Sequence, residues 1–312
     1  MQINYIILAH QNPDQLSRLV QRLNTENVCF YIHIDLKSDI DSFRSELERY
    51  SQHVIFIENR VNCFWGDVSM VSATLNCMHH ILADQRVGYT VLISGQDYPL
   101  KSNEYIMNFF NQHYGVNFIN MFSLPTNNWT DKGMNRVENY KLNLSDRRGD
   151  FRIIPPLIDS HILKHFANAE SPRVLAVIDE NLETLMKPRT TLSYIDQFYG
   201  GCQWWAFPIE SIEYILNFLV VHPDYVDFYK YSFVPDELFF HTIVGNTPEL
   251  FEKVQKSVTY VDWENGPFYP AIFDMSYYDK LIIRDELFAR KFDCNLDSTI
   301  LDSIDYKLDL IH

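Results

Sequence analysis

The first third of the chain alternates short apolar runs with amphipathic stretches, and this alternation limits the folds open to it. Apolar runs of this kind are typical of buried strands, and they occur at 5–9, 28–34, 54–57, 89–93 and 117–121. Between them, apolar side chains recur at helical spacing over 16–23, 43–50, 70–81 and 105–110. Strands that alternate with helices predict right-handed crossovers. We therefore expect an α/β fold with a mostly parallel central sheet flanked by helices.

Composition excludes several classes of function. The 312 residues include 26 basic and 41 acidic side chains, which give a net charge of −15. Nucleic-acid binding and broad docking to anionic lipid both need a basic face, so neither is favoured. Five cysteines are scattered without a CxxC pair. This pattern argues against a disulfide scaffold or a zinc ribbon and favours a reducing compartment.

The organisation of the chain favours one domain over 1–312. No internal repeat or linker-like stretch divides it, and no apolar run is long enough for a membrane span. No signal peptide is visible at the start, where the first predicted strand follows almost at once. The middle segment, 125–189, is polar, and we expect it to form loops and short helices that cover the sheet.

A parallel sheet binds ligands at the carboxyl ends of its strands. That rule selects His10, Asp35, Arg60 and the 94–98 loop as candidate site positions. The sequence contains no GxGxxG, GxxxxGK[ST] or GxSxG motif, so dinucleotide, P-loop and esterase sites lose their usual support. The 11 histidines show no zinc-binding spacing such as HExxH.

Seven short motifs give the chain a resemblance to a known family. They are YIILAH at 5–10, HID at 33–35, WGDVSMV at 65–71, LISGQDYPLK at 92–101, QWW at 203–205, VPDE at 234–237 and LFARKFD at 287–293. In this order they resemble the core-2/I-branching β-1,6-N-acetylglucosaminyltransferase family, which also contains the peptide O-xylosyltransferases. The resemblance runs from about residue 3 to 295. It implies a GT-A fold, a UDP-sugar donor, inversion at the anomeric carbon and no catalytic metal.

Inverting glycosyl transfer needs a base for the acceptor hydroxyl and positive charge for the departing diphosphate. Glu237 follows Pro235 and Asp236 at a predicted helix start, and the resemblance places the family's catalytic glutamate there. The residues alone also allow a structural explanation of this acidic pair. Asp236 would cap the helix N-terminus, and Glu237 would interact favourably with the helix dipole. Asp97 either binds the donor sugar or serves as the base, if the enzyme behaves like the xylosyltransferases.

A metal-free mechanism leaves the diphosphate charge to side chains. Lys291 matches the family lysine that contacts the diphosphate, and Arg290 precedes it. Side chains one apart on a helix diverge, so Arg290 is open to solvent on that interpretation. The family's branching enzymes have an arginine upstream of this lysine, where residues 268–270 here read Phe-Tyr-Pro. Arg284, Arg290, Arg60 or backbone amides must then supply the second stabilising group.

Most GT-A enzymes hold Mn²⁺ or Mg²⁺ through a DxD after a central strand. The corresponding residues here are Ser94, Gly95, Gln96 and Asp97, without a second carboxylate. A literal DxD does occur at 39–41, after the second strand, and we interpret it as a helix start. We therefore expect no metal and no cofactor, since the UDP-sugar is a substrate.

The remaining candidates surround these groups. The resemblance implies that Asp35 accepts a hydrogen bond from the uracil or ribose and that His10 lines the nucleotide pocket. From the residues alone, Asp35 is equally well explained as a turn residue at the end of a strand. His10 is equally well explained by a structural hydrogen bond. Gly95 permits close approach of the backbone to a ligand, and Gln96 and Arg60 complete the nucleotide-sugar group.

Aromatic side chains are candidates for sugar contacts. Alternate strand residues point to opposite faces, so Trp204 and Trp205 should place one indole in the core and one in the cleft. Trp65 is expected on the nucleotide side. The polar middle, where an acceptor site would be built, supplies the candidates Trp129, Arg136, Glu138 and Tyr140.

The resulting hypothesis assigns 1–122 to the nucleotide and 123–312 to acceptor binding and catalysis. It describes an inverting, metal-independent glycosyltransferase that uses a UDP-sugar, with GlcNAc favoured and xylose as the alternative. Two alternatives from other functional classes stay open. One is a glycoside hydrolase that uses paired carboxylates, and the other is a carbohydrate-binding protein without catalytic activity.

Context completes the hypothesis. An unanchored start and few cysteines predict a bacterial cytoplasmic enzyme, with peripheral association at the inner membrane left open. Its acceptor would be a glycan or lipid-linked saccharide in surface polysaccharide synthesis. The oligomeric state is not predicted.

Overall fold

The computed structural model describes residues 1–159, 170–189, 192–265 and 270–310. A seven-stranded sheet in the order β10-β6-β9-β4-β1-β2-β3 forms its centre. These strands are β1 Ile3–Ala9, β2 Val28–Ile34, β3 Val54–Phe56, β4 Tyr89–Ser94, β6 Asn117–Ser123, β9 Tyr199–Pro208 and β10 Val254–Gln255. β9 runs antiparallel to its neighbours, and the other pairs are parallel. The expected α/β class with a mostly parallel sheet is confirmed.

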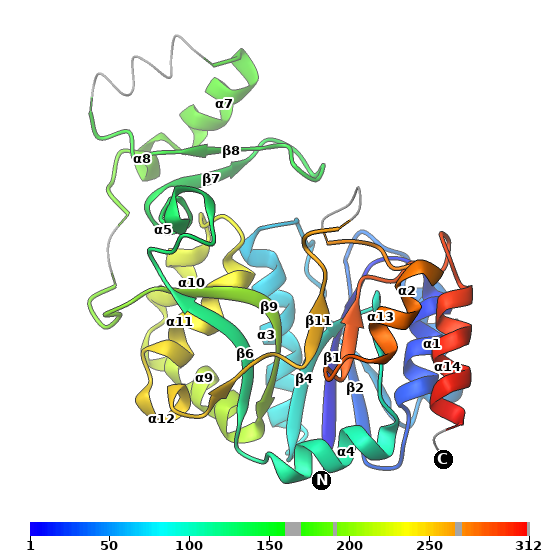
Figure 1. Ribbon diagram of the computed structural model, residues 1–312. Helices are drawn as coiled ribbons and strands as arrows, with labels where there is room; N and C mark the ends of the chain where they lie inside the picture. Colours follow the sequence, from blue (N-terminus) through cyan, green and yellow to red (C-terminus); the bar gives the residue numbers. More distant parts are fainter. Residues whose placement is uncertain (160–169, 190–191, 266–269, 311–312) are drawn as a thin grey trace.

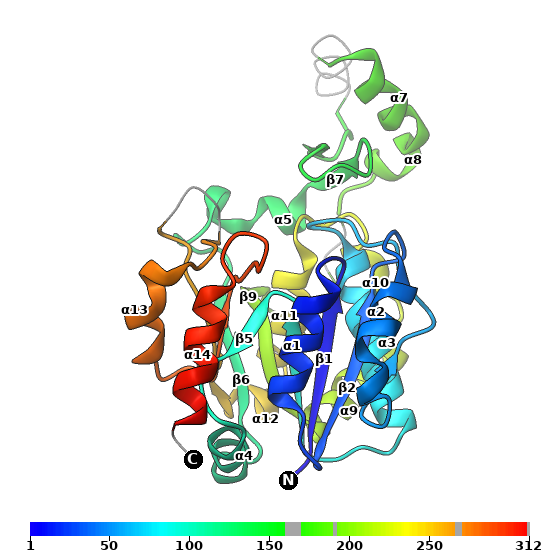
Figure 2. The ribbon, with the colours of Figure 1, turned by 90° about the vertical axis from the view of Figure 1, so that its right-hand side faces the viewer.

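Helices cover both faces of this sheet (Figures 1 and 2). One face packs against α1 Pro13–Leu23, α2 Ile40–Leu47, α4 Asn103–Gln112 and α14 Thr299–Asp309. The other packs against α3 Val68–Ala83, α9 Ile209–Val221, α10 Asp224–Tyr229 and α11 Phe239–Gly245. Along β1, Tyr5 and Ile7 enter the first core, whereas Ile6 and Leu8 enter the second. Because both faces are buried, these strands are continuous apolar runs.

A second sheet adjoins the carboxyl end of β4. It has three short strands in the order β11-β12-β5, formed by β5 Asp97–Pro99, β11 Thr259–Val261 and β12 Phe288–Arg290. β12 follows α13 Tyr278–Ile282 and pairs antiparallel with β5. The position of Arg290 on a strand corrects the helix expected around this residue. Strands of three residues are too short to show a hydrophobic period, which is why the sequence did not reveal them.

The polar middle segment also differs from expectation. The short helix α5 Asn135–Glu138 leads into a lobe that projects beyond the carboxyl edge of the sheet instead of covering it (Figure 1). The lobe comprises the antiparallel pair β7 Tyr140–Asn143 and β8 Phe151–Ile154, with α7 Pro172–Glu180 and α8 Leu182–Leu185. Its apolar side chains form a small core of their own, so burial does not require contact with the sheet.

Acidic residues cap the helices that begin near this edge. The Asp39 side chain accepts a hydrogen bond from the backbone N–H of Asp41 at 3.1 Å, and Asp67 accepts from Ser69 at 3.0 Å. The DxD at 39–41 is therefore the start of α2, as the sequence predicts. The VPDE motif forms a 3₁₀ turn, Pro235–Glu237, directly before α11.

Replacing the cap residue tests this assignment. We expect Asp39→Ala to lower the free energy of unfolding by about 1 kcal/mol, because it removes an N-cap acceptor. Asp39→Asn keeps an acceptor but loses the charge, so it should stay close to the wild-type protein. Urea unfolding measures both variants. Equal destabilisation by the two would contradict the capping role.

Candidate active site

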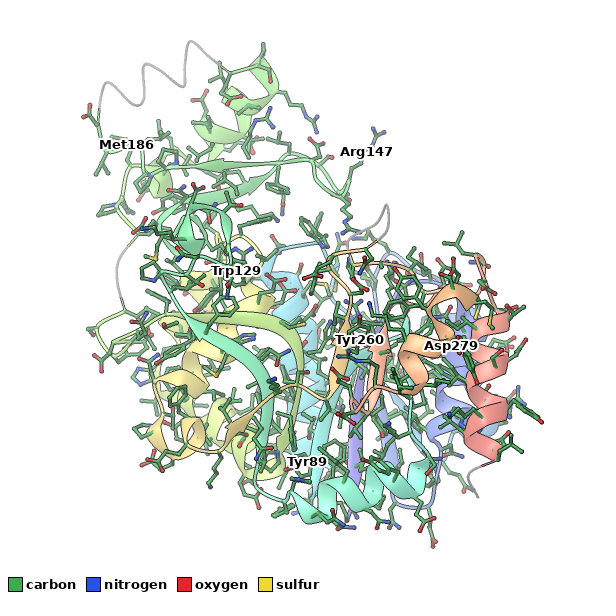
Figure 3. All side chains as sticks on the ribbon, in the orientation of Figure 1. Tyr89, Trp129, Arg147, Met186, Tyr260 and Asp279 are labelled. Carbon is green, nitrogen blue, oxygen red and sulfur yellow. The ribbon has the colours of Figure 1, made fainter. Side chains whose placement is uncertain are left out.

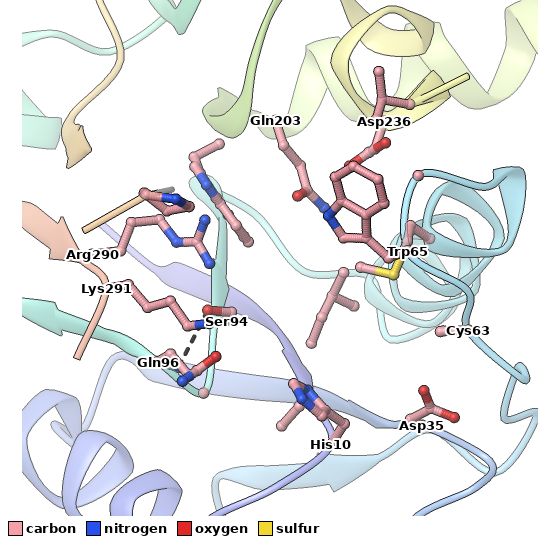
Figure 4. Close-up of a pocket in the computed structure, with 18 of the residues that line it drawn as sticks. His10, Asp35, Cys63, Trp65, Ser94, Gln96, Gln203, Asp236, Arg290 and Lys291 are labelled. Atoms are coloured by element: carbon pink, nitrogen blue, oxygen red, sulfur yellow. Dashed lines mark hydrogen bonds between the residues drawn. The ribbon is translucent and has the colours of Figure 1, made fainter. Parts of the chain in front are cut away.

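A pocket lies at the carboxyl edge of the central sheet, where the sheet rule places it (Figure 4). Of the candidates named from the sequence, those that line it are His10, Asp35, Trp65, Gly95, Gln96, Trp204, Asp236, Glu237, Arg290 and Lys291. They come from both 1–122 and 123–312, so the two expected halves meet at one site.

Carboxyl groups of the turn before α11 form one side of the pocket. The Glu237 side chain is 21% exposed, and its Oε2 accepts a hydrogen bond from Arg136 Nη1 at 3.0 Å. Burial and the adjacent Asp236 raise the pKa of Glu237 to about 7, although Arg136 opposes the rise. Burial also raises the pKa of Asp236 to about 6. A carboxyl group that titrates near neutrality suits general-base chemistry.

The guanidinium that holds Glu237 is itself held by an aromatic ring. Arg136 Cζ lies 3.4 Å from the centroid of the Trp129 ring. Trp129 in turn packs over Gly200, where a Cβ would come within 2.4 Å of the indole. Arg136 and Trp129, expected in an acceptor site, therefore position the candidate base.

Basic side chains form the opposite side of the pocket (Figure 4). Arg290 Cζ lies 4.1 Å from the centroid of the Trp204 ring, and Arg290 Nε lies 3.5 Å from Asp97 Oδ2. Lys291 is partly buried, and burial lowers its pKa, with Arg290 adding to the effect. Arg290 thus faces the pocket, which corrects the expectation that it is open to solvent.

Asp97 lies behind the pocket wall rather than on it. The carboxylate is fully buried and accepts hydrogen bonds from the backbone N–H of Ser94, at 2.9 Å, and from the Ser94 hydroxyl. Burial raises the pKa of Asp97, while Arg290 and Ser94 oppose the rise. Because it does not reach the pocket, this position does not fit a base or a sugar ligand. Asp97 instead positions Ser94 and Arg290.

On the nucleotide side, the ends of β1 and β2 supply His10 and Asp35. The buried Asp35 accepts a hydrogen bond from the backbone N–H of Lys37 at 3.0 Å. Arg60 does not line the pocket. It donates to the carbonyls of Ile34, Asp35 and Ser38, and so fixes the end of β2.

The candidates for the second diphosphate-binding cation differ in whether they line the pocket. Arg284 pairs with Glu286 at 2.7 Å and lies away from the pocket lining, as Arg60 does. Only Arg290 of the three side chains proposed from the sequence lines the pocket. In the 268–270 segment, residues 268 and 269 lie outside the described residues, and Pro270 lines the pocket.

The acceptor candidates also divide. Trp204 lines the pocket while Trp205 stacks on Phe207 in the core, at 4.4 Å between ring centroids, as strand alternation predicts. Glu138 is exposed, and the Tyr140 hydroxyl donates to the carbonyl of Lys187 inside the lobe. Neither of the last two lines the pocket.

Further residues that were not candidates from the sequence also line the pocket, among them Gln203, Arg148 and Trp263. Gln203 belongs to the QWW motif, and Arg148 belongs to a basic pair at 147–148 within the polar middle segment. Trp263 carried no signal, since it follows a strand of three residues.

The described residues contain neither a metal-binding cluster nor a membrane-spanning helix. Residues 1–159, 170–189, 192–265 and 270–310 contain no group of three or more His, Cys, Asp or Glu side chains arranged to hold a metal ion. Within the same ranges, no helix has the length and apolar character that crossing a bilayer requires.

Comparison with known proteins adds to this geometry. The sequence profile of the core-2/I-branching enzymes matches residues 3–152 and 163–285. The chain belongs to the core-2/I-branching enzyme family. Within this glycosyltransferase family it is similar to mouse xylosyltransferase 2, with 23% identity across 99% of this chain and 34% of the mouse protein. Human xylosyltransferase 1 is 21% identical over 99% of this chain and 30% of its own length.

The family member described here therefore spans about a third of the length of these curated relatives. Among solved structures, a putative glucose-1-phosphate thymidylyltransferase from Bacillus anthracis aligns over 82% of this chain and 86% of its own, with 11% identity and a TM-score of 0.35.

The Arg136–Glu237 contact makes a prediction about titration. The positive charge of Arg136 favours the carboxylate, so Arg136→Gln should raise the pKa of Glu237 above its value of about 7. Carbon NMR of the Glu237 carboxyl group measures the midpoint. Arg152→Gln removes the same charge from an exposed position on β8 and should leave the midpoint unchanged. A midpoint that stays the same or falls in Arg136→Gln would contradict the contact.

Proposed function

We propose that this protein is an inverting glycosyltransferase that moves a sugar from a UDP-sugar to a hydroxyl of a glycan acceptor. The observation that carries the proposal is the charge distribution of the pocket. All four charged side chains line the pocket: Asp236 and Glu237 come from the turn before α11, and Arg290 and Lys291 come from the end of β12 and the residue after it. Figure 4 shows Asp236 across the pocket from Arg290 and Lys291. Such a site matches a reaction that releases a proton at one end and negative charge at the other.

The proposed reaction is a single displacement. The acceptor oxygen attacks the anomeric carbon from the face opposite the diphosphate, so the configuration inverts. Glu237 takes the hydroxyl proton as the new bond forms. The bond from the anomeric carbon to the diphosphate oxygen breaks, and UDP leaves with its electron pair. Arg290 and Lys291 neutralise the charge that develops, a role a divalent cation has in other enzymes.

A glycosidase is less well supported. Two carboxyl groups must flank the scissile bond in that reaction. Asp97 lies behind the wall, and Asp236 and Glu237 are adjacent on one turn. The basic wall of Arg290 and Lys291 has no part in glycoside hydrolysis.

The donor and the acceptor are finer questions. We propose UDP-GlcNAc as the donor, in keeping with the branching enzymes that the sequence motifs resemble. UDP-xylose is the second candidate, favoured by the similarity to xylosyltransferases across almost the whole chain. For the acceptor we propose a saccharide, free or lipid-linked, used in surface polysaccharide synthesis in a bacterial cytoplasm.

Release of UDP from the two donors, each with and without EDTA, tests the proposal. We expect one donor to be consumed at a rate that EDTA does not change, and UDP to raise the melting temperature. Loss of activity with EDTA and its return with Mn²⁺ would contradict the metal-free mechanism. Failure of UDP to stabilise the protein would contradict the use of a UDP-sugar.

Glu237→Gln tests the base. A positioned base contributes roughly 10²–10⁴-fold to the rate, so kcat should fall by that order while UDP affinity stays unchanged. In the wild-type enzyme, kcat/KM should fall as the pH drops below about 7, because Glu237 is then protonated. Glu213→Gln, on an exposed position of α9, serves as the control. Near-normal turnover by Glu237→Gln would remove the residue from this role.

A further inference from the structure

The turn between β7 and β8 returns from the lobe to the pocket. Arg148, in this turn, lines the pocket, and its Cζ lies 4.9 Å from the centroid of the Trp65 ring, which lines it too. Figure 3 shows this end of the hairpin, labelled at Arg147, above the carboxyl edge of the central sheet. A side chain far from the motifs in sequence is thereby brought to the site.

Several contacts fix the hairpin in this position. Lys141, 2% exposed, lies 3.7 Å from Asp67, and Asn143 donates to the same carboxylate at 2.9 Å. The Phe151 ring packs beside Trp65 and Phe233, with centroids 6.3 and 5.1 Å apart. The base of the hairpin is therefore attached to the main body at the rim of the pocket.

The turn itself is also held in place. Arg173 pairs with Asp150 at 2.7 Å and donates to the carbonyl of Leu144 at 2.9 Å. These bonds join the two ends of the turn that carries Arg148. The approach of Arg148 to the pocket is thus a feature of the fold rather than of one free side chain.

The charges around the pocket are not balanced on the basic side. Arg290 has Asp97 as a partner, but within the described part of the chain neither Arg148 nor Lys291 forms an ion pair. This is notable in a protein with 41 acidic residues. Two unpaired cations on one pocket favour an anion with more than one charge.

The charge of Arg148 affects two groups that line the pocket, His10 and Lys291. Burial lowers the pKa of His10 and of Lys291, and the charge of Arg148 adds to both effects. By contrast, Arg136 is the cation that opposes the raised pKa of Glu237. The charge of Arg148 therefore acts on groups at the nucleotide end of the pocket.

We propose that Arg148 binds the diphosphate of the UDP-sugar together with Lys291. This inference rests on the proposed function. Arg148 adds a third cation to Arg290 and Lys291, and it does so from a different part of the fold. Because the diphosphate gains negative charge as the sugar leaves, Arg148 stabilises the departing UDP more than the intact donor.

Binding of UDP and of uridine by calorimetry tests the proposal. We expect Arg148→Gln to weaken UDP binding about tenfold, which corresponds to about 1.4 kcal/mol, and to leave uridine binding unchanged. Arg147→Gln removes the same charge from the neighbouring position and should keep UDP affinity within about twofold of wild type. Arg148→Lys retains the charge and should restore most of the affinity.

Several results would overturn it. Arg148→Gln with wild-type UDP affinity would remove Arg148 from the diphosphate site, and equal losses for uridine and UDP would place its effect on the nucleoside. Unchanged UDP affinity with a higher KM for the acceptor would assign Arg148 to the acceptor instead. If the wild-type protein does not bind UDP, the proposed function fails first, and the two failures are thus distinguishable. Melting temperatures of all variants show whether each remains folded.

Discussion

The buried Asp97 carboxylate links the two sheets on which the pocket is built, because it contacts Ser94 at the end of β4 in the central sheet and Arg290 on β12 in the second sheet. Asp97 begins β5, directly after β4, and Arg290 ends β12, its antiparallel partner. The carboxylate also accepts from Ser94, so one group ties the turn after β4 to the strand that carries the basic residues. A buried charge is tolerated only when it is paired and hydrogen-bonded. The need to satisfy Asp97 therefore places Arg290 over Trp204 and brings Lys291 beside it.

A second chain of contacts serves the opposite side. Trp129 supports Arg136, Arg136 holds Glu237, and burial with Asp236 raises the pKa of that carboxyl group. The pocket thus has two walls of opposite charge, each supported by a separate part of the fold. The β7–β8 turn adds Arg148 to the basic wall from the lobe.

Much of the fold follows from local pattern. Strands such as β1 and β2 are continuous apolar runs because both of their faces are buried, and helices such as α3 have apolar side chains at helical spacing. The carboxyl ends of β1, β2 and β4 do carry site residues, as the sheet rule predicts. The sequence does not predict the three-residue strands β5 and β12, because they form by pairing with each other across a long stretch of sequence.

The site was predictable where a motif and a pocket position coincide. Glu237 and Lys291 are examples, since both line the pocket. A motif does not show whether a side chain reaches the pocket, however. Asp97 is fully buried, and Arg60 donates hydrogen bonds to backbone carbonyls, so neither lines the pocket. Arg136 lies 101 positions before Glu237, and its contact depends on tertiary packing. Arg148 reaches the site through a lobe whose projection no periodicity reveals.

Gly200 shows how far such dependence extends. It has no titratable group and takes no part in chemistry, yet Trp129 occupies the space that its side chain would fill. Alanine is the smallest replacement, and it already collides with the indole. The constraint on this position is therefore inherited from Glu237, to which Trp129 and Arg136 connect it. Tolerance to substitution here is set by the support of the Glu237 side chain rather than by strand preference.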